Sequence, residues 1–158
     1  MLIGLLFTQT ACSNGISIEH DERNPEIIIS EKMKFENLRV LELDVNHNDN
    51  KKVLNVFGDE LKDGIYAYNK KNKTYILINS NTRNYTDYSF KFDKKKKTLT
   101  LSYTTTEGSI TNEKTLFLIE SKKKNQFEEL KLVNNGNDDG FVGVFTIEFY
   151  IIVNFYKF

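Results

Sequence analysis

The stretch Tyr88-Ser-Phe-Lys-Phe-Asp-Lys-Lys-Lys-Lys-Thr-Leu-Thr-Leu-Ser-Tyr103 carries the clearest structural signal in this chain. Apolar and polar residues alternate over 88–92 and again over 98–104, as they do in strands with one buried face. The four lysines between the two runs must stay in water, so they mark a turn. The stretch therefore predicts an antiparallel hairpin with one apolar face.

Further strand-like runs extend this pattern in both directions. They lie at 26–30, 37–45, 65–68, 74–79, 115–120 and 127–133. Residues 53–61 predict one short helix through Val53, Phe57 and Leu61. Twelve Phe and eight Tyr against one Pro favour strands, and 158 residues suit one domain. We predict a mainly β fold, a single small antiparallel sandwich or barrel-like meander with at most one short helix.

Lysine-rich links join every second pair of these strands, at 69–73, 93–97 and 121–125. In an up-and-down antiparallel sheet such alternate links lie at the same end. One end is therefore expected to be basic and able to contact an anionic lipid or wall polymer. The candidate residues are Lys94, Lys95, Lys96, Lys97, Lys122, Lys123 and Lys124. The alternative is that these lysines only serve solubility and protect strand edges.

The remaining links, 80–87 and 105–114, are rich in Thr, Ser and Asn and are expected at the opposite end. Arginine and tyrosine are favoured at interface hot spots. We therefore predict a protein-binding site formed by Arg83, Tyr85, Thr86 and Tyr88. Ordinary turns are the alternative.

The overall charge is balanced, but its distribution is not. Residues 1–61 hold 6 Lys/Arg and 11 Asp/Glu, whereas 62–133 hold 15 and 8. The zero net charge argues against a general nucleic-acid binder. The acidic first third can partly neutralise the basic middle within the fold.

The single cysteine, Cys12, closes an apolar run that begins at Met1. Thr10-Ala11-Cys12 resembles the end of the bacterial lipobox, although Gln9 stands where that motif has an aliphatic residue. The resemblance implies a signal peptide at 1–11, a lipidated Cys12, a polar tether at 12–24 and a β domain at 25–158, outside the cytoplasm on a membrane. The alternative is a buried first strand with an ordinary core cysteine.

The C-terminal stretch from Phe141 to Phe158 allows three interpretations. Apolar residues occupy the odd positions from Phe145 to Phe155, which favours a long strand with one buried face. A membrane-spanning helix is disfavoured by Glu148 near its centre. An altered reading frame is the third interpretation.

No catalytic motif is present. His20 and His47 are the only near-neutral bases, and neither has a catalytic neighbour pattern. Asp44, Asn46 and Asn48 have the opening rhythm of a calcium loop, but the required glycine and glutamate are missing. We predict no enzyme activity, no cofactor and no tight metal site.

Residues 64–133 resemble the C-terminal domain of the protease complex subunit PrcB family. Gly64-Ile-Tyr-Ala-Tyr68 and Lys73-Thr-Tyr-Ile-Leu-Ile78 match its opening hairpin, and Leu116-Phe-Leu-Ile-Glu120 matches a later strand. Thr82-Arg-Asn-Tyr-Thr-Asp-Tyr-Ser89 is similar to a loop and strand of that family. The resemblance implies a noncatalytic surface module that binds a protein partner and assists an extracytoplasmic protease. Envelope binding through the lysines is the second functional hypothesis.

Overall fold

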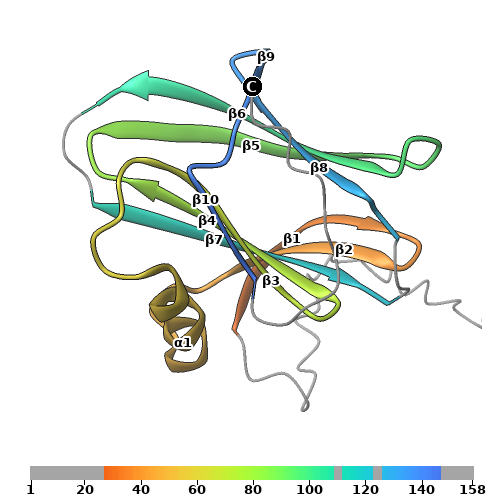
Figure 1. The fold of residues 1–158 in the computed structure, drawn as a ribbon, viewed down its shortest axis with the longest axis horizontal. Helices are drawn as coiled ribbons and strands as arrows, with labels where there is room; N and C mark the ends of the chain where they lie inside the picture. Colours follow the sequence, from red (N-terminus) through yellow and green to blue (C-terminus); the bar gives the residue numbers. More distant parts are fainter. Residues whose placement is uncertain (1–26, 109–111, 123–125, 147–158) are drawn as a thin grey trace, which may run out of the picture.

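The computed structural model describes residues 27–108, 112–122 and 126–146 of the chain. Two β-sheets lie face to face, and a short helix packs on the outside of the larger sheet (Figure 1). The larger sheet has six strands in the order β1-β2-β7-β4-β3-β10. These are β1 (Ile28–Phe35), β2 (Leu38–Leu43), β7 (Glu113–Ser121), β4 (Lys73–Ser80), β3 (Gly64–Lys70) and β10 (Gly143–Thr146).

The smaller sheet has four strands in the order β5-β6-β8-β9. These are β5 (Arg83–Asp93), β6 (Thr98–Glu107), β8 (Glu129–Asn134) and β9 (Asn137–Asp139). The prediction of a small, mainly β sandwich with one short helix is confirmed for the described residues.

The core between the sheets is built from alternate residues of both. The rings of Tyr88 and Phe90 on β5 meet the buried ring of Phe117 edge-on, with centroid distances of 5.3 and 5.1 Å. Leu99 and Leu101 of β6 are fully buried in the same cluster. The hairpin of β5 and β6 therefore has the single apolar face that its alternation predicts.

The central strands of the larger sheet are apolar on both faces. The runs 65–68, 75–78 and 116–119 are buried throughout. One face meets the smaller sheet, and the other forms a second apolar cluster that includes the helix. Continuous apolar runs are typical of strands covered on both sides.

The helix α1 spans Asn48–Phe57 and packs on this outer face. The ring of Phe57 lies 6.2 Å from Tyr68 and 5.5 Å from Phe145. The predicted range, 53–61, is wrong because Gly58, with φ of 89°, ends the helix in a conformation that favours glycine.

The expected up-and-down strand order is wrong. The chain crosses from the larger to the smaller sheet between β4 and β5, returns for β7 and crosses again to β8. Two pairings, β3 with β10 and β6 with β8, are parallel. The strands that are apolar on both faces, β3, β4 and β7, lie inside the larger sheet, where the helix and the smaller sheet each cover one face, and the β5–β6 hairpin with one apolar face lies in the smaller sheet.

Bulges explain why two strands are longer than predicted. β5 begins at Arg83, and a register shift between Thr86 and Ser89, where Asp87 has φ of 56°, interrupts its alternation. β1 likewise continues to Phe35 through two register shifts. Each bulge moves the side chains to the other face, so a period of two no longer identifies the strand.

The predicted C-terminal strand is described only at its start. β10 begins two residues before Phe145 and pairs with β3, while residues 147–158 lie outside the described residues. Cys12, the predicted signal peptide and the tether also lie outside them. In the part of the chain that the structure describes, no helix has the length and hydropathy needed to cross a bilayer.

Candidate functional site

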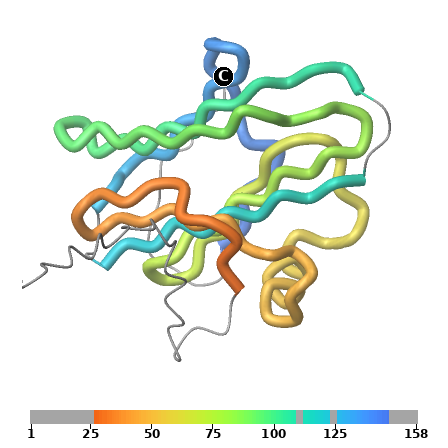
Figure 2. The backbone as a smooth tube through the Cα atoms, turned by 180° about the vertical axis from the view of Figure 1, so that it is seen from behind, coloured from red at the N-terminus to blue at the C-terminus, as the bar shows by residue number. Residues whose placement is uncertain are grey.

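Four chain reversals lie at one end of the sandwich, on the right in Figure 1 and on the left in Figure 2. They are the β1–β2, β3–β4 and β5–β6 turns and the β7–β8 link. The last of these is bonded to the other three through backbone N–H groups: Ser121 donates to Asn72 (3.1 Å), Lys122 to Asn37 (2.9 Å) and Glu128 to Lys97 (2.8 Å). The four reversals therefore form one continuous surface, which we call the lysine end.

The lysine end carries more positive than negative charge. Its described lysines are Lys70, Lys71, Lys73, Lys94, Lys95, Lys96, Lys97 and Lys122. The carboxylates among or beside them are Glu36, Asp93, Glu120, Glu128 and Glu129. The sequence predicts that the lysine-rich links share one end, and the structure brings them together, although through two sheets and not one.

Three of the lysines are partly neutralised by ion pairs. The Nζ atoms lie 2.6 Å from Glu36 for Lys94, 2.5 Å from Glu128 for Lys97 and 3.4 Å from Glu120 for Lys73. Within the described residues, the other five have no carboxylate at ion-pair distance: Lys70, Lys71, Lys95, Lys96 and Lys122. All five of these lysines are exposed.

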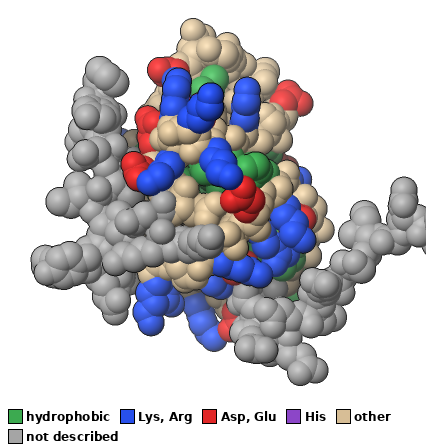
Figure 3. Space-filling model, turned by 90° about the vertical axis from the view of Figure 1, so that its right-hand side faces the viewer, with side chains coloured by type: hydrophobic (Ala, Val, Ile, Leu, Met, Phe, Trp, Pro, Cys, Tyr) green, Lys and Arg blue, Asp and Glu red, His purple; other side chains and the backbone are tan. Residues whose placement is uncertain are grey.

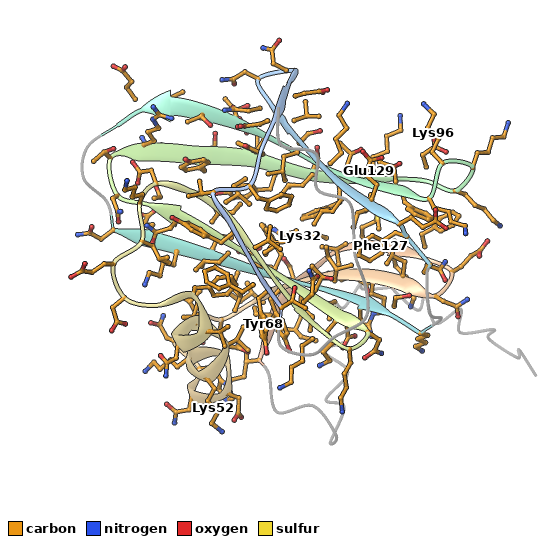
Figure 4. All side chains as sticks on the ribbon, viewed as in Figure 1. Lys32, Lys52, Tyr68, Lys96, Phe127 and Glu129 are labelled. Carbon is orange, nitrogen blue, oxygen red and sulfur yellow. The ribbon has the colours of Figure 1, made fainter. Side chains whose placement is uncertain are left out.

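Asp93 is used inside its own turn. Its Oδ1 accepts the backbone N–H of Lys95 (2.9 Å) and of Lys96 (3.2 Å), while Lys97 has φ of 52°. An aspartate that bonds to the backbone two residues on is a common turn former. The side chains of Lys95 and Lys96 are exposed, and Lys96 points away from the sandwich in Figure 4.

Half-buried aromatic rings lie among these lysines. The rings of Phe35 on β1 and Phe92 on β5 are 5.4 Å apart, and Nζ of Lys94 lies 5.9 Å from the Phe35 centroid. Phe127 in the β7–β8 link packs against the same core (Figure 4). Figure 3, which faces this end, shows basic side chains around a strip of apolar surface.

The predicted protein-binding residues lie on strand β5 and not in a loop. Tyr88 is directed inward against Phe117, its hydroxyl donates to the carbonyl of Tyr85 (2.7 Å), and burial raises its pKa to about 12. The turn expected at 80–87 contains only Asn81 and Thr82 between strands. The alternation of β5 before its bulge does not reveal which of these side chains face the core.

Tyr85 is also partly withdrawn from solvent. Its ring lies 5.9 Å from that of Tyr103, whose hydroxyl donates to Asp139 at 2.5 Å. Burial first, and then the Asp139 carboxylate, raise the pKa of Tyr103. Arg83 and Thr86 remain exposed, so the structure leaves two of the four predicted residues on the surface.

Asp63 holds the short β4–β5 turn in place. Its carboxylate accepts the backbone N–H groups of Asn81 and Thr82 and the Thr82 hydroxyl. Burial acts to raise the pKa of Asp63, but these hydrogen bonds outweigh it, and the pKa lies below its usual value. The polar side chains at the β4–β5 turn therefore stabilise the conformation of the turn.

The residues of the discarded calcium pattern form the entry to α1. Oδ1 of Asp44 accepts the backbone N–H of Asn46 (2.9 Å), and the Asn50 amide donates to the carbonyl of Asp44 (2.8 Å). His47 occupies the N-cap position, with Nδ1 3.9 Å from Asp49. Within the described residues, no three His, Cys, Asp or Glu side chains converge as metal ligands would.

Comparisons with protein-family models, with curated proteins and with solved structures give no match. The resemblance of residues 64–133 to the PrcB C-terminal domain stays a prediction. Lys123 and Lys124 lie outside the described residues, as does Cys12. Sequence reasoning did not place Phe35 in the basic surface, because only the packing of β1 against β5 brings it there.

Proposed function

We propose that this chain is a noncatalytic binding module whose lysine end attaches to a surface of clustered phosphate groups. The observation that carries the proposal is the convergence of four chain reversals with five lysines that lack a carboxylate partner in the described part. Ammonium groups donate three hydrogen bonds each and accept none, so they suit phosphate oxygens. The sandwich holds them on one side.

The opposite end supports the contrast. It carries α1, the Asp63-bound turn and the start of β7. Three exposed lysines lie there on different elements and pair with no carboxylate of the described residues: Lys51, Lys62 and Lys114. Figure 4 shows Lys52 of α1 and Lys96 of the β5–β6 turn on opposite sides of the molecule. Three lysines can therefore be replaced at either end, and the variant at the opposite end serves as the control for the variant at the lysine end.

The test compares Lys71→Gln/Lys95→Gln/Lys96→Gln with Lys51→Gln/Lys62→Gln/Lys114→Gln. Binding of the full chain is measured by sedimentation with phosphatidylglycerol vesicles and by titration with soluble polyphosphate. Each lysine near an anionic surface contributes about 1 kcal/mol, so the first variant should bind about 100-fold more weakly. The second should stay close to wild type, since its charges lie well beyond a screening length of about 10 Å at 0.1 M salt. Equal losses in both variants would contradict the proposal.

A lipid anchor at Cys12 is compatible with this orientation. β1 starts opposite the end of β2, away from the lysine end. The chain from residue 12 to 27 can span at most about 50 Å, whereas a ten-residue strand such as β6 is about 33 Å long. An anchored module can therefore turn its lysine end to the same membrane. Mass spectrometry of the mature N-terminus tests the anchor.

A protein partner at the opposite end is the second candidate. Arg83 and Thr86 are exposed on β5, which is an edge strand, so a partner can reach both side chains and the strand edge. The test is capture of a defined partner by the soluble domain, with Arg83→Ala/Thr86→Ala against Lys51→Ala as control. Undiminished capture by the double variant would exclude this site.

A further inference from the structure

The lysines of the lysine end that pair with no described carboxylate form two groups on different sheets. Two of them lie in the β5–β6 turn and form the smaller-sheet group: Lys95 and Lys96. Three lie at the end of the larger sheet and form the larger-sheet group: Lys70, Lys71 and Lys122. Asn72 joins the members of the larger-sheet group, because its carbonyl accepts the Ser121 N–H (3.1 Å) and its side-chain amide donates to the Ser121 carbonyl (3.2 Å).

The two groups lie well apart on the surface of the lysine end. Stacked sheets are about 10 Å apart, and neighbouring strands are about 5 Å apart. With the strand order β1-β2-β7-β4-β3, the β3–β4 turn lies three strand spacings from the β1–β2 turn, which is roughly 15 Å. Figures 1 and 2 both show the β1–β2 turn between the β3–β4 and β5–β6 turns. A ligand that contacts both groups must therefore be at least about 10 Å long.

Exposed carboxylates lie between and beside the two groups. Glu36 occupies the β1–β2 turn, and Glu128 lies beside Lys97 just before β8. A flat anionic bilayer against this end would bring lipid phosphates close to both carboxylates, and like charges brought together oppose binding. A linear anionic chain can contact each lysine group and leave the carboxylates in water. The charge pattern therefore favours a chain over a flat surface.

Contacts between the sheets hold the two groups at a fixed separation. The ion pair of Lys94 with Glu36 and the ring contact of Phe35 with Phe92 join the β5–β6 turn to the β1–β2 turn. The β1–β2 turn in its turn accepts the N–H of Lys122 in the larger-sheet group (2.9 Å). Because neither sheet has to move, a ligand that has reached one group can contact the other with little further ordering.

We infer that the phosphates bound by the lysine end belong to a single linear polyanion that bridges the larger-sheet and smaller-sheet groups. This inference rests on the proposed function. Once the chain is bound to one group, the contact with the second is intramolecular. Affinity should therefore rise steeply when the chain becomes long enough to span both groups.

The experiment compares tripolyphosphate, which is too short to reach both groups, with a polyphosphate of roughly 20 units, which exceeds their separation. Affinity is measured by thermophoresis of the full chain, labelled at its N-terminus, with polyphosphate in excess. Lys70→Gln/Lys71→Gln/Lys122→Gln removes one group and Lys95→Gln/Lys96→Gln the other. The control is the opposite-end variant, Lys51→Gln/Lys62→Gln/Lys114→Gln.

Wild type and control should bind the long chain about 100-fold more tightly than tripolyphosphate. Either group variant should gain about tenfold at most, since a longer chain then only offers more positions to bind.

The other outcomes separate the two proposals. If the gain from chain length is equal in wild type and in both group variants, the bridging is overturned, and the proposed function stands as long as those variants bind the long chain more weakly than the control. Tighter binding to phosphatidylglycerol vesicles than to the long chain, at equal phosphate concentration, assigns the surface to a bilayer, which overturns the inference and keeps the proposed function. Equal affinity of wild type and all variants for the long chain overturns both.

Discussion

Lys94 Nζ lies 2.6 Å from Oε1 of Glu36, which joins the β5–β6 turn of one sheet to the β1–β2 turn of the other. Both side chains are largely exposed, at 68% and 47%. An exposed ion pair of this kind stabilises a fold by less than about 1 kcal/mol. The main consequence of the pair is that the Glu36 carboxylate lies within the lysine end and partly neutralises Lys94.

Replacement of Glu36 should therefore strengthen anion binding. Glu36→Gln frees Lys94 and removes a negative charge, so affinity for phosphatidylglycerol vesicles should rise about fivefold, equivalent to about 1 kcal/mol. The melting temperature should hardly change. Glu60→Gln, an exposed glutamate in the link after α1, is the control and should leave affinity unaltered. Unchanged or weaker binding by Glu36→Gln speaks against the lysine end as the binding surface.

Substitution of Asp63 should weaken the fold and remove part of its acid sensitivity. Asp63→Asn loses charge-assisted hydrogen bonds to Asn81 and Thr82, so the free energy of unfolding at pH 7 should fall by about 1–2 kcal/mol. The folded-state pKa of Asp63 is lowered, so its stabilisation is complete above the unfolded-state pKa of about 4 and is lost as the pH falls through the folded-state value.

Urea unfolding of both proteins from pH 7 to pH 2 measures this effect. The difference in stability between wild type and Asp63→Asn should shrink below about pH 4. Asp59→Asn, at an exposed position in the same link, controls for charge alone. A difference that stays constant over the whole range is the contrary result.

Two glycines test how β10 is held. Gly64 has φ of 143°, and a Cβ there would clash with Cγ2 of Val142, whereas Gly136 has φ of 81° and open space around it. Gly136→Ala should cost about 1–2 kcal/mol from its backbone conformation alone. Gly64→Ala should cost more, since it also displaces the segment that leads into β10.

Hydrogen exchange locates that displacement. In Gly64→Ala, the amides of Val144 and Phe145 should exchange faster than in wild type, because β10 is displaced from β3. Gly136→Ala should not show this change. If Gly64→Ala and Gly136→Ala change the exchange rates equally, the Val142 side chain must shift without displacing β10.

The alternating residues of the β5–β6 hairpin were sufficient to predict a one-sided hairpin, because each strand has only one buried face. Alternation does not identify the strand at Leu116–Ile119, because both of its faces are buried. The helix covers the second face, and nothing in the local sequence pattern predicts that contact. Alternation also fails at the bulge near Asp87. The lysine-rich links are grouped because the strand direction reverses at every link from β3 to β8, whichever sheet the strands join.

The composition of the candidate site was harder to predict. Lys94–Lys97 are visible as a charged turn, but the position of Phe35 depends on a contact between the edges of two sheets. Tyr88 was included in the predicted protein-binding site, although the alternation of 88–92 places it on the apolar face, and its ring packs on Phe117. Neither contact joins residues that are neighbours in the sequence, so local patterns carry no information about them.

The most direct test of the account is amide chemical-shift mapping of the full chain during titration with soluble polyphosphate, which reports the binding surface without requiring a variant. The account predicts the largest shifts at Lys71, Lys95, Lys96 and Lys122, and their reversal at high salt. Shifts centred on Lys51, Lys62 and Arg83, or spread evenly over all lysines, would contradict it.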